Sequence, residues 1–86
     1  MQIDFHKSFK KNFVKLPPKI QSKFNERYLL FCENQLNPLL HYHPLTGKLA
    51  GFYSINVTGD YRAQFYYKSA EHIIFLRIGT HSQLYG

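Results

Sequence analysis

Residues 52–78, FYSINVTGDYRAQFYYKSAEHIIFLRI, decide the fold of this chain of 86 residues. Aromatic and β-branched side chains, which favour β-strands, fill three segments of this stretch: residues 52–57, 61–68 and 71–78. The segments are separated by Thr58-Gly59-Asp60 and Ser69-Ala70, which are short enough to be tight turns. The stretch therefore predicts a three-stranded antiparallel meander.

The segment before the meander has the period of a helix. Four apolar residues follow one another at spacings of four, four and three, which puts them on one helical stripe: Phe5, Phe9, Phe13 and Leu16. Pro17-Pro18 ends this helix, and a second one is expected to begin at Pro18, because proline's missing N–H costs nothing in a first turn. The second helix is expected to end at Asn37-Pro38.

Residues 1–5 alternate well enough for a short edge strand. The sequence thus predicts an α+β fold: an N-terminal short strand and a helical hairpin pack on one face of a twisted, mainly antiparallel sheet that contains the C-terminal meander. Because the loops are short and no linker or repeat interrupts them, residues 1–86 are expected to form a single domain.

The charge, hydropathy and cysteine content limit which kinds of partner and which cellular compartment fit this chain. The net charge of +6 favours an acidic partner such as nucleic acid, an anionic protein or a membrane surface. No apolar run is long enough to span a membrane and no signal-peptide core is seen, so we expect a cytoplasmic protein without a membrane partner. The single cysteine, Cys32, fits a reducing compartment, and its apolar neighbours predict that it is buried.

The lengths of the two turns predict how the strands pair. If Ser69-Ala70 are the central residues of the second turn, Arg62 faces Arg77, and a three-residue first loop makes Asn56 face Arg62. Asn56, Arg62 and Arg77 are then expected in one row across three strands. The opposite face is expected to carry the apolar residues that the helices cover: Ile55, Ala63, Phe65, Ile74, Leu76 and Ile78.

Two arginines that face each other repel, so something must offset the repulsion. A phosphate that accepts hydrogen bonds from both guanidinium groups would do so. Alternatively, the two side chains splay apart, or Asp60 and the C-terminal carboxylate neutralise them.

Two polar clusters supply further chemistry: residues 43–48, HPLTGK, and residues 77–86, RIGTHSQLYG. Cutting RNA through its 2′-hydroxyl requires a base, an acid and cations for the charge that develops on phosphorus. His43 and His81 are candidates for the acid and the base, because imidazole exchanges protons near neutral pH. Tyr85 could stack on an RNA base. Together the clusters predict a site that binds and cuts a phosphodiester.

The order of these motifs resembles a known family. Two helices, the HPLTGK segment, a meander with Gly59-Asp60-Tyr61-Arg62 and the ending GTHSQLYG are similar to the RelE/ParE toxin superfamily, and within it to the YafQ-like branch. The resemblance implies a RelE-like fold and the toxin half of a bacterial toxin–antitoxin pair. RelE-type toxins cut mRNA in the ribosomal A site, whereas ParE-type toxins act on DNA gyrase.

The HPLTGK segment and the Gly-Thr-His ending favour an endoribonuclease, an mRNA interferase without a cofactor. Its expected partners are an acidic, DNA-binding antitoxin, mRNA and the ribosomal A site. The resemblance, with the expected row of arginines, implies catalytic roles for His43, Asp60, Arg62, Arg77, His81 and Tyr85. Contacts to RNA are expected from Lys48, Asn56, Tyr61 and Gln64.

Asn56 stands where YafQ-like enzymes have a further catalytic histidine, and an amide cannot exchange a proton near neutral pH. Two other functions therefore stay open: a gyrase inhibitor that cuts nothing, and a catalytically weakened module that only binds an antitoxin. A zinc site built from His41, His43 and His81 is a further alternative. No cysteine pair or carboxylate-rich motif supports it, so no metal is expected, and His6, His41 and His72 are expected to be ordinary surface histidines.

Overall fold

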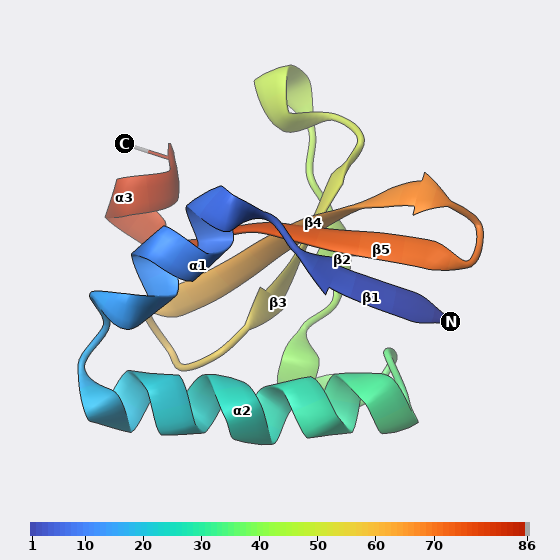
Figure 1. Cartoon of the computed structure of the whole chain (residues 1–86). Coiled ribbons are helices and arrows are strands. Elements are labelled where there is room, and N and C mark those ends of the chain that lie inside the picture. The colour runs from blue at the N-terminus through green and yellow to red at the C-terminus, as the bar shows by residue number, and fades with distance from the viewer. Residues whose placement is uncertain (86) are drawn as a thin grey trace.

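A computed structural model describes residues 1–85 and has an α+β architecture around a five-stranded sheet (Figure 1). The chain runs through β1 (Gln2–Phe5), α1 (Lys7–Val14), α2 (Pro18–Glu33), β2 (His43–Pro44), β3 (Phe52–Asn56), β4 (Tyr61–Ser69), β5 (His72–Thr80) and α3 (His81–Tyr85). Two short 3₁₀ turns, η1 (Pro38–Leu40) and η2 (Gly47–Leu49), flank β2. The predicted strand, helical hairpin and meander are all present.

The strands are arranged in the order β1-β5-β4-β3-β2. The strand β1 pairs parallel to β5, and every other pairing is antiparallel. In Figure 1, α2 runs along the lower side of the sheet, whereas α3 and the loop with η2 project on the upper side. One face of the sheet is thus covered by the predicted helical hairpin, whereas α3 and the loop with η2 lie on the other face.

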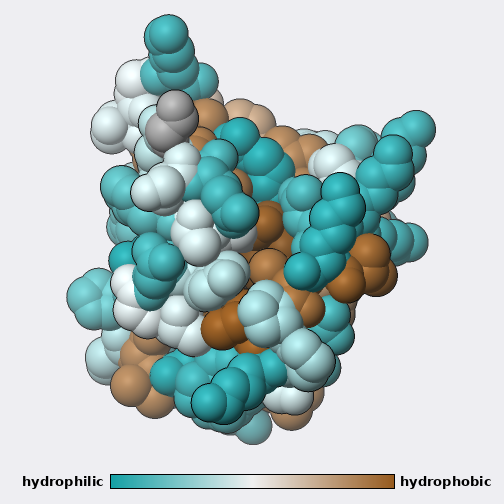
Figure 2. Space-filling model, turned by 90° about the vertical axis from the view of Figure 1, so that its left-hand side faces the viewer, coloured by the Kyte–Doolittle hydropathy of each residue, from teal (hydrophilic) through white to brown (hydrophobic). Residues whose placement is uncertain are grey.

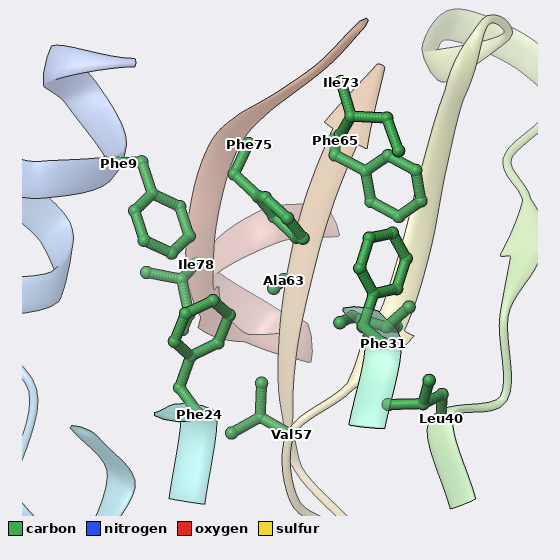
Figure 3. Packing of buried hydrophobic residues seen from close by; sticks show 11 residues of the cluster. Phe9, Phe24, Phe31, Leu40, Val57, Ala63, Phe65, Ile73, Phe75 and Ile78 are labelled. Atoms are coloured by element: carbon green, nitrogen blue, oxygen red, sulfur yellow. The ribbon is translucent and has the colours of Figure 1, made fainter. Parts of the chain in front are cut away.

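The core between the hairpin and the sheet is largely aromatic (Figure 3). Phe9 of α1 and Phe24 of α2 meet Phe75 of β5, with ring centroids 5.8 and 5.9 Å from it. Phe31, near the end of α2, lies 5.2 Å from Phe65 of β4. These rings are all buried, so the stripe predicted from the spacing of phenylalanines is the surface that joins both helices to the sheet.

The predicted pairing of Arg62 with Arg77 is wrong. Arg62 faces Gly79 and Arg77 faces Gln64, although Asn56 does face Arg62 as predicted. The turn lies one residue later than expected, because Ser69 pairs with His72. The register also shifts twice along β4 and β5, which leaves one residue of each strand without an opposite partner.

These shifts change which residues of β5 fill the core. Ile73 and Phe75 belong to the buried cluster, whereas Ile74 and Leu76, which were expected there, lie outside it; Ile74 is nevertheless buried and Leu76 is half-buried. The other residues predicted for that face are buried as expected: Ile55, Ala63, Phe65 and Ile78.

Two further predictions about the helices need correction. Cys32 is exposed, because it follows the buried Phe31 on α2 and so is turned about 100° away from the core-facing stripe. The helix α2 ends at Glu33 rather than at Asn37-Pro38, and the side chain of Asn37 instead caps η1 by accepting from the Leu39 N–H. Within residues 1–85 no helix has the length and apolar character that crossing a bilayer requires.

Candidate active site

A cleft of about 580 Å³ opens on the side of the sheet away from the helical hairpin. It is bordered by the segment around β2 and η2, by the facing ends of β3 and β4, and by α3. Its lining combines imidazoles, a guanidinium, an amide and a phenol with a few apolar side chains: His41, His43, Pro44, Leu45, Thr46, Leu49, Asn56, Arg62, His81 and Tyr85.

His43 enters the cleft from β2, where it pairs with Ser54. Its Nδ1 lies 2.7 Å from the carbonyl oxygen of His41. A carbonyl only accepts, so Nδ1 carries the proton and donates it, and in the neutral ring Nε2 is left with a lone pair. His41 has a φ of 47°, a left-handed conformation that ends η1.

The neighbour of His43 on the other face, Tyr42, anchors this segment in the core. Its hydroxyl lies 3.2 Å from that of Tyr67, and its ring stacks on Tyr53 with centroids 5.5 Å apart. Burial, with the Tyr67 hydrogen bond as a smaller cause, raises the pKa of Tyr42 far above its ordinary value. The phenol therefore stays neutral and keeps β2, only two residues long, against the sheet.

His81 and Tyr85 reach the cleft from α3. Because they are four residues apart on a helix, their rings lie on one face, with centroids 4.6 Å apart and an interplanar angle of 38°. The backbone N–H of His81 donates to the carbonyl oxygen of Asp60 over 3.0 Å. The α3 segment is thereby tied to the turn between β3 and β4.

Arg62 holds that same turn from the other side. Its Nη1 lies 3.0 Å from the carbonyl oxygens of Thr58 and Gly59, and 3.2 Å from that of Tyr61. Residues 1–85 contain two salt bridges, Lys23–Glu26 and His72–Asp4. Neither Arg62 nor Arg77 is therefore paired with a carboxylate in this part of the chain.

The structure therefore contradicts the alternative in which Asp60 neutralises Arg62 and Arg77. The C-terminal carboxylate belongs to Gly86, which lies outside the described residues. An arginine in a cleft with no carboxylate partner is suited to bind an anion.

Five of the expected site residues do not line the cleft: Lys48, Asp60, Tyr61, Gln64 and Arg77. Lys48 is exposed on η2 and Asp60 on the β3–β4 turn. Tyr61 packs against the core on the face of the helices, so the structure does not support the expectation that it contacts RNA in this cleft.

Gln64 and Arg77 lie on the cleft side of the sheet, in one row across four strands with His43 and Ser54. Neighbours in such a row have Cβ atoms about 5 Å apart. Gln64 and Ser54 are fully buried, and among residues 1–85 neither side chain has a hydrogen-bond partner. A row of polar side chains, buried in its middle, therefore runs across the strands from His43 to Arg77.

The sequence interpretation missed His41 and Ser54. It treated His41 as an ordinary surface histidine, whereas the structure puts His41 at the cleft and its carbonyl on the His43 ring. No local signal marks Ser54, since only the pairing of β2 with β3 brings it beside His43. Of the other histidines expected at the surface, His6 is exposed and caps α1, whereas His72 is half-buried and pairs with Asp4 of β1.

Three histidines reach the cleft, but the described part of the chain contains no group of three or more His, Cys, Asp or Glu that could hold a metal ion. The cleft thus offers imidazoles, which can exchange protons, beside the fixed guanidinium of Arg62.

Several solved structures with this fold are toxins. The chain matches, over residues 1–86, the model of the family described as "bacterial toxin of type II toxin-antitoxin system, YafQ". The crystal structure of YafQ from E. coli strain BL21(DE3) has 26% sequence identity and a TM-score of 0.81, with 99% of this chain and 98% of that chain covered. YafQ in the E. coli DinJ–YafQ toxin–antitoxin complex has 27% identity and a TM-score of 0.77, with 99% and 97% covered.

A copper-bound mutant toxin from Helicobacter pylori has 28% identity and a TM-score of 0.76, with 99% of both chains covered. No curated protein matches the sequence significantly. The match to the family extends over the whole chain and confirms the resemblance seen in the sequence motifs. This protein therefore belongs to the YafQ family of toxins of bacterial type II toxin–antitoxin systems.

Proposed function

We propose that this toxin is an endoribonuclease that cuts mRNA in the ribosomal A site, using the 2′-hydroxyl of the RNA as the nucleophile. The observation that carries the proposal is that two imidazoles, of His43 and His81, line one cleft with the guanidinium of Arg62. Acid, base and cation are the three groups that this reaction requires.

The hydrogen bond on His43 supports a role for this residue as the base. With Nδ1 donating to the His41 carbonyl, Nε2 of the neutral ring is free to take the proton from the 2′-hydroxyl. The 2′-oxygen then bonds to phosphorus, the bond from phosphorus to the 5′-oxygen breaks, and a 2′,3′-cyclic phosphate remains. His81 is the acid that gives its proton to the departing 5′-oxygen.

Arg62 stabilises the negative charge that develops on the phosphoryl oxygens, and Arg77 supports it from the next row of the sheet. Tyr85, 40% exposed, is available to stack on an RNA base. Asn56 contributes hydrogen bonds to the substrate but no proton transfer. Lys48, on the exposed η2 turn, is available to a neighbouring phosphate, and Asp60 acts through its carbonyl contact with His81 rather than as the primary base.

The test uses purified toxin, ribosomes and a defined mRNA, with the cut mapped by primer extension. His43→Ala and His81→Ala should each slow cleavage by about 10²- to 10⁴-fold, the usual contribution of a general acid or base. His72→Ala is the matched control, because His72 lies at the far end of β5 and should leave the rate unchanged.

An mRNA with a single 2′-deoxynucleotide at the cut site should resist cleavage. Cleavage of that RNA at the normal rate would overturn the 2′-hydroxyl mechanism. Growth arrest with DNA damage and intact transcripts would indicate the gyrase inhibitor, and binding of an antitoxin without either lesion would indicate the catalytically weakened module.

We also propose that the antitoxin partner docks in the α1–α2 groove, an apolar hollow of about 420 Å³ lined mainly by Phe5, Phe9, Phe13, Val14 and Phe24. Figure 2 shows hydrophobic residues gathered on this side of the molecule, with hydrophilic residues around them. The helix α1 carries Lys7, Lys10 and Lys11 and no acidic residue, which favours an acidic segment with apolar side chains as the occupant.

Val14 is the sharpest probe of this groove, because its side chain is 72% exposed and needs no rearrangement to be covered. Val14→Asp should weaken the affinity for the antitoxin encoded beside the toxin, by adding an unpaired carboxylate to an apolar contact. Leu39→Asp, exposed outside the groove, is the control. Equal affinities of the two variants would exclude the groove.

A further inference from the structure

The helix α3 begins with a reciprocal pair of hydrogen bonds between Thr80 and Gln83. The N–H of Thr80 donates to Oε1 of Gln83 over 2.8 Å, and the N–H of Gln83 donates to Oγ1 of Thr80 over 3.2 Å. This is a capping box, in which the residue before the helix and the third helical residue each satisfy the other's free N–H. The first turn, which carries His81, is therefore fixed at its start.

A second tie fixes the same turn to the sheet. The N–H of His81 donates to the Asp60 carbonyl over 3.0 Å, and the turn that contains Asp60 is held by Nη1 of Arg62. Since Nη1 carries only two hydrogens, the three carbonyls that surround it share them. The position of His81 relative to Arg62 thus depends on where α3 begins.

Gly79 makes room for this arrangement. It faces Arg62 across the strands, and a Cβ added to Gly79 would lie 2.8 Å from Oε1 and 3.4 Å from Cβ of Gln83. Any side chain at residue 79 would therefore push away the oxygen that accepts from Thr80. The glycine in the Gly-Thr-His ending thus allows a close approach of the Gln83 side chain, and it does not serve a left-handed φ.

We propose that Gln83 is a positioning residue for the acid His81 and for Tyr85. Its side chain is exposed and does not line the cleft, so it acts through the capping box, which holds the face of α3 with both rings over the cleft. The inference rests on the proposed nuclease function, because it assigns Gln83 a part in that reaction. A displacement of about 1 Å in a reacting group can lower the rate about 100-fold.

The test compares Gln83→Ala with Gln83→Glu and with Ser82→Ala in the ribosome-dependent cleavage assay. Gln83→Ala should lower kcat about 10- to 100-fold, because His81 is misplaced, and should raise KM by a smaller factor, because Tyr85 is displaced from the RNA base on which it stacks. Gln83→Glu should keep kcat near that of the wild type, since a carboxylate accepts the same hydrogen bond; any repulsion of RNA would appear in KM. Ser82→Ala, exposed and next in the chain, should change neither.

Gly79→Ala gives an independent check, because its added Cβ would displace Oε1 of Gln83 from the N–H of Thr80. Alone it should lower kcat as Gln83→Ala does, and in the Gln83→Ala background it should have no further effect. Fully additive losses would overturn the proposal, as would a Gln83→Ala variant with wild-type kcat, or a Gln83→Glu variant as slow as Gln83→Ala.

An NMR measurement separates this inference from the proposed function. In the wild type the Thr80 amide should be protected from exchange and the rings of His81 and Tyr85 should show mutual contacts, and both signals should vanish in Gln83→Ala but not in Ser82→Ala. If the wild type cuts no RNA, the nuclease proposal fails on its own. If the signals persist in Gln83→Ala, the positioning role fails whatever the toxin cuts.

Discussion

Replacing Phe75 by alanine should remove the largest single contribution to the stability of this toxin. Phe75 is fully buried, and its ring centroid lies between 5.1 and 6.3 Å from six other aromatic rings, those of Phe5, Phe9, Phe24, Tyr28, Phe31 and Phe65. Among residues 1–85, no other ring in the core contacts rings of α1, α2, β1 and β4 together.

A buried phenylalanine replaced by alanine costs about 3 to 5 kcal/mol in the free energy of unfolding, from lost burial and from the cavity that remains. The upper end of that range is expected here, because the surrounding rings come from four different elements and cannot all move in to fill the space. A domain of this size has a total stability of about 4 to 13 kcal/mol. Phe75→Ala should therefore remove between about 40% and all of it.

The assay is urea unfolding followed by circular dichroism. With an m-value of about 1 kcal/mol/M, the unfolding midpoint should fall by about 3 to 5 M. Phe75→Leu, which keeps the site apolar, should lose less and provides a folded variant if Phe75→Ala is unfolded in water. Phe52→Ala is the matched control, since Phe52 is half-buried and makes an edge-to-face contact with Tyr66, with centroids 5.8 Å apart, on the other face of the sheet. A loss for Phe75→Ala no greater than that for Phe52→Ala would refute this account of the core.

Three further predictions concern single residues. Gln64→Met should raise the melting temperature, because neither polar atom of the buried amide has a hydrogen-bond partner within residues 1–85. An unsatisfied buried polar group costs about 1 to 3 kcal/mol. A lower melting temperature of the variant would mean that the amide is hydrogen-bonded. His41→Gly should be at least as stable as the wild type and His41→Val clearly less so, because a φ of 47° suits glycine and opposes a β-branched residue; equal melting temperatures would contradict this. The Cys32 thiol should react with a thiol reagent in the absence of denaturant, and protection of the folded protein would show that it is buried after all.

The elements of this fold are easier to predict from the sequence than the contacts between them. The spacing of Phe5, Phe9 and Phe13 and the change of period at residue 52 mark the helices and the meander, because each signal is local and repeated. The predicted pairing of Arg62 with Arg77 was wrong for two reasons. The second turn lies one residue later than expected, and each register shift comes from a single extra residue that has no recognisable signal in the sequence. A two-residue strand such as β2 gives no periodic signal at all.

The same distinction holds for the site. His43, Arg62, His81 and Tyr85 were found because their residue types carry chemistry, and the structure brings them to one cleft. The sequence Thr80-x-x-Gln83 is a capping signature that can be recognised in the sequence. The hydrogen bond between the His43 ring and the His41 carbonyl has no such signature, because every residue has a carbonyl and only the left-handed conformation of His41 directs this one at the ring. Residue types thus predict the candidate groups of the cleft, and backbone geometry determines which ring nitrogen of His43 carries the proton.

The parallel pairing of β1 with β5 has a consequence for the order of folding. Gln2 is opposite His72, so β1 has no partner until the chain has been made beyond residue 72. Closing so long a loop is entropically costly and makes this contact a late event, whereas the antiparallel turns between β3, β4 and β5 close quickly. A chain that stops before β5 lacks both the partner of β1 and the central ring of the core. A fragment of the toxin released during interrupted synthesis is therefore expected to be unfolded and harmless, and the toxic state is reached only when the last strand has been made.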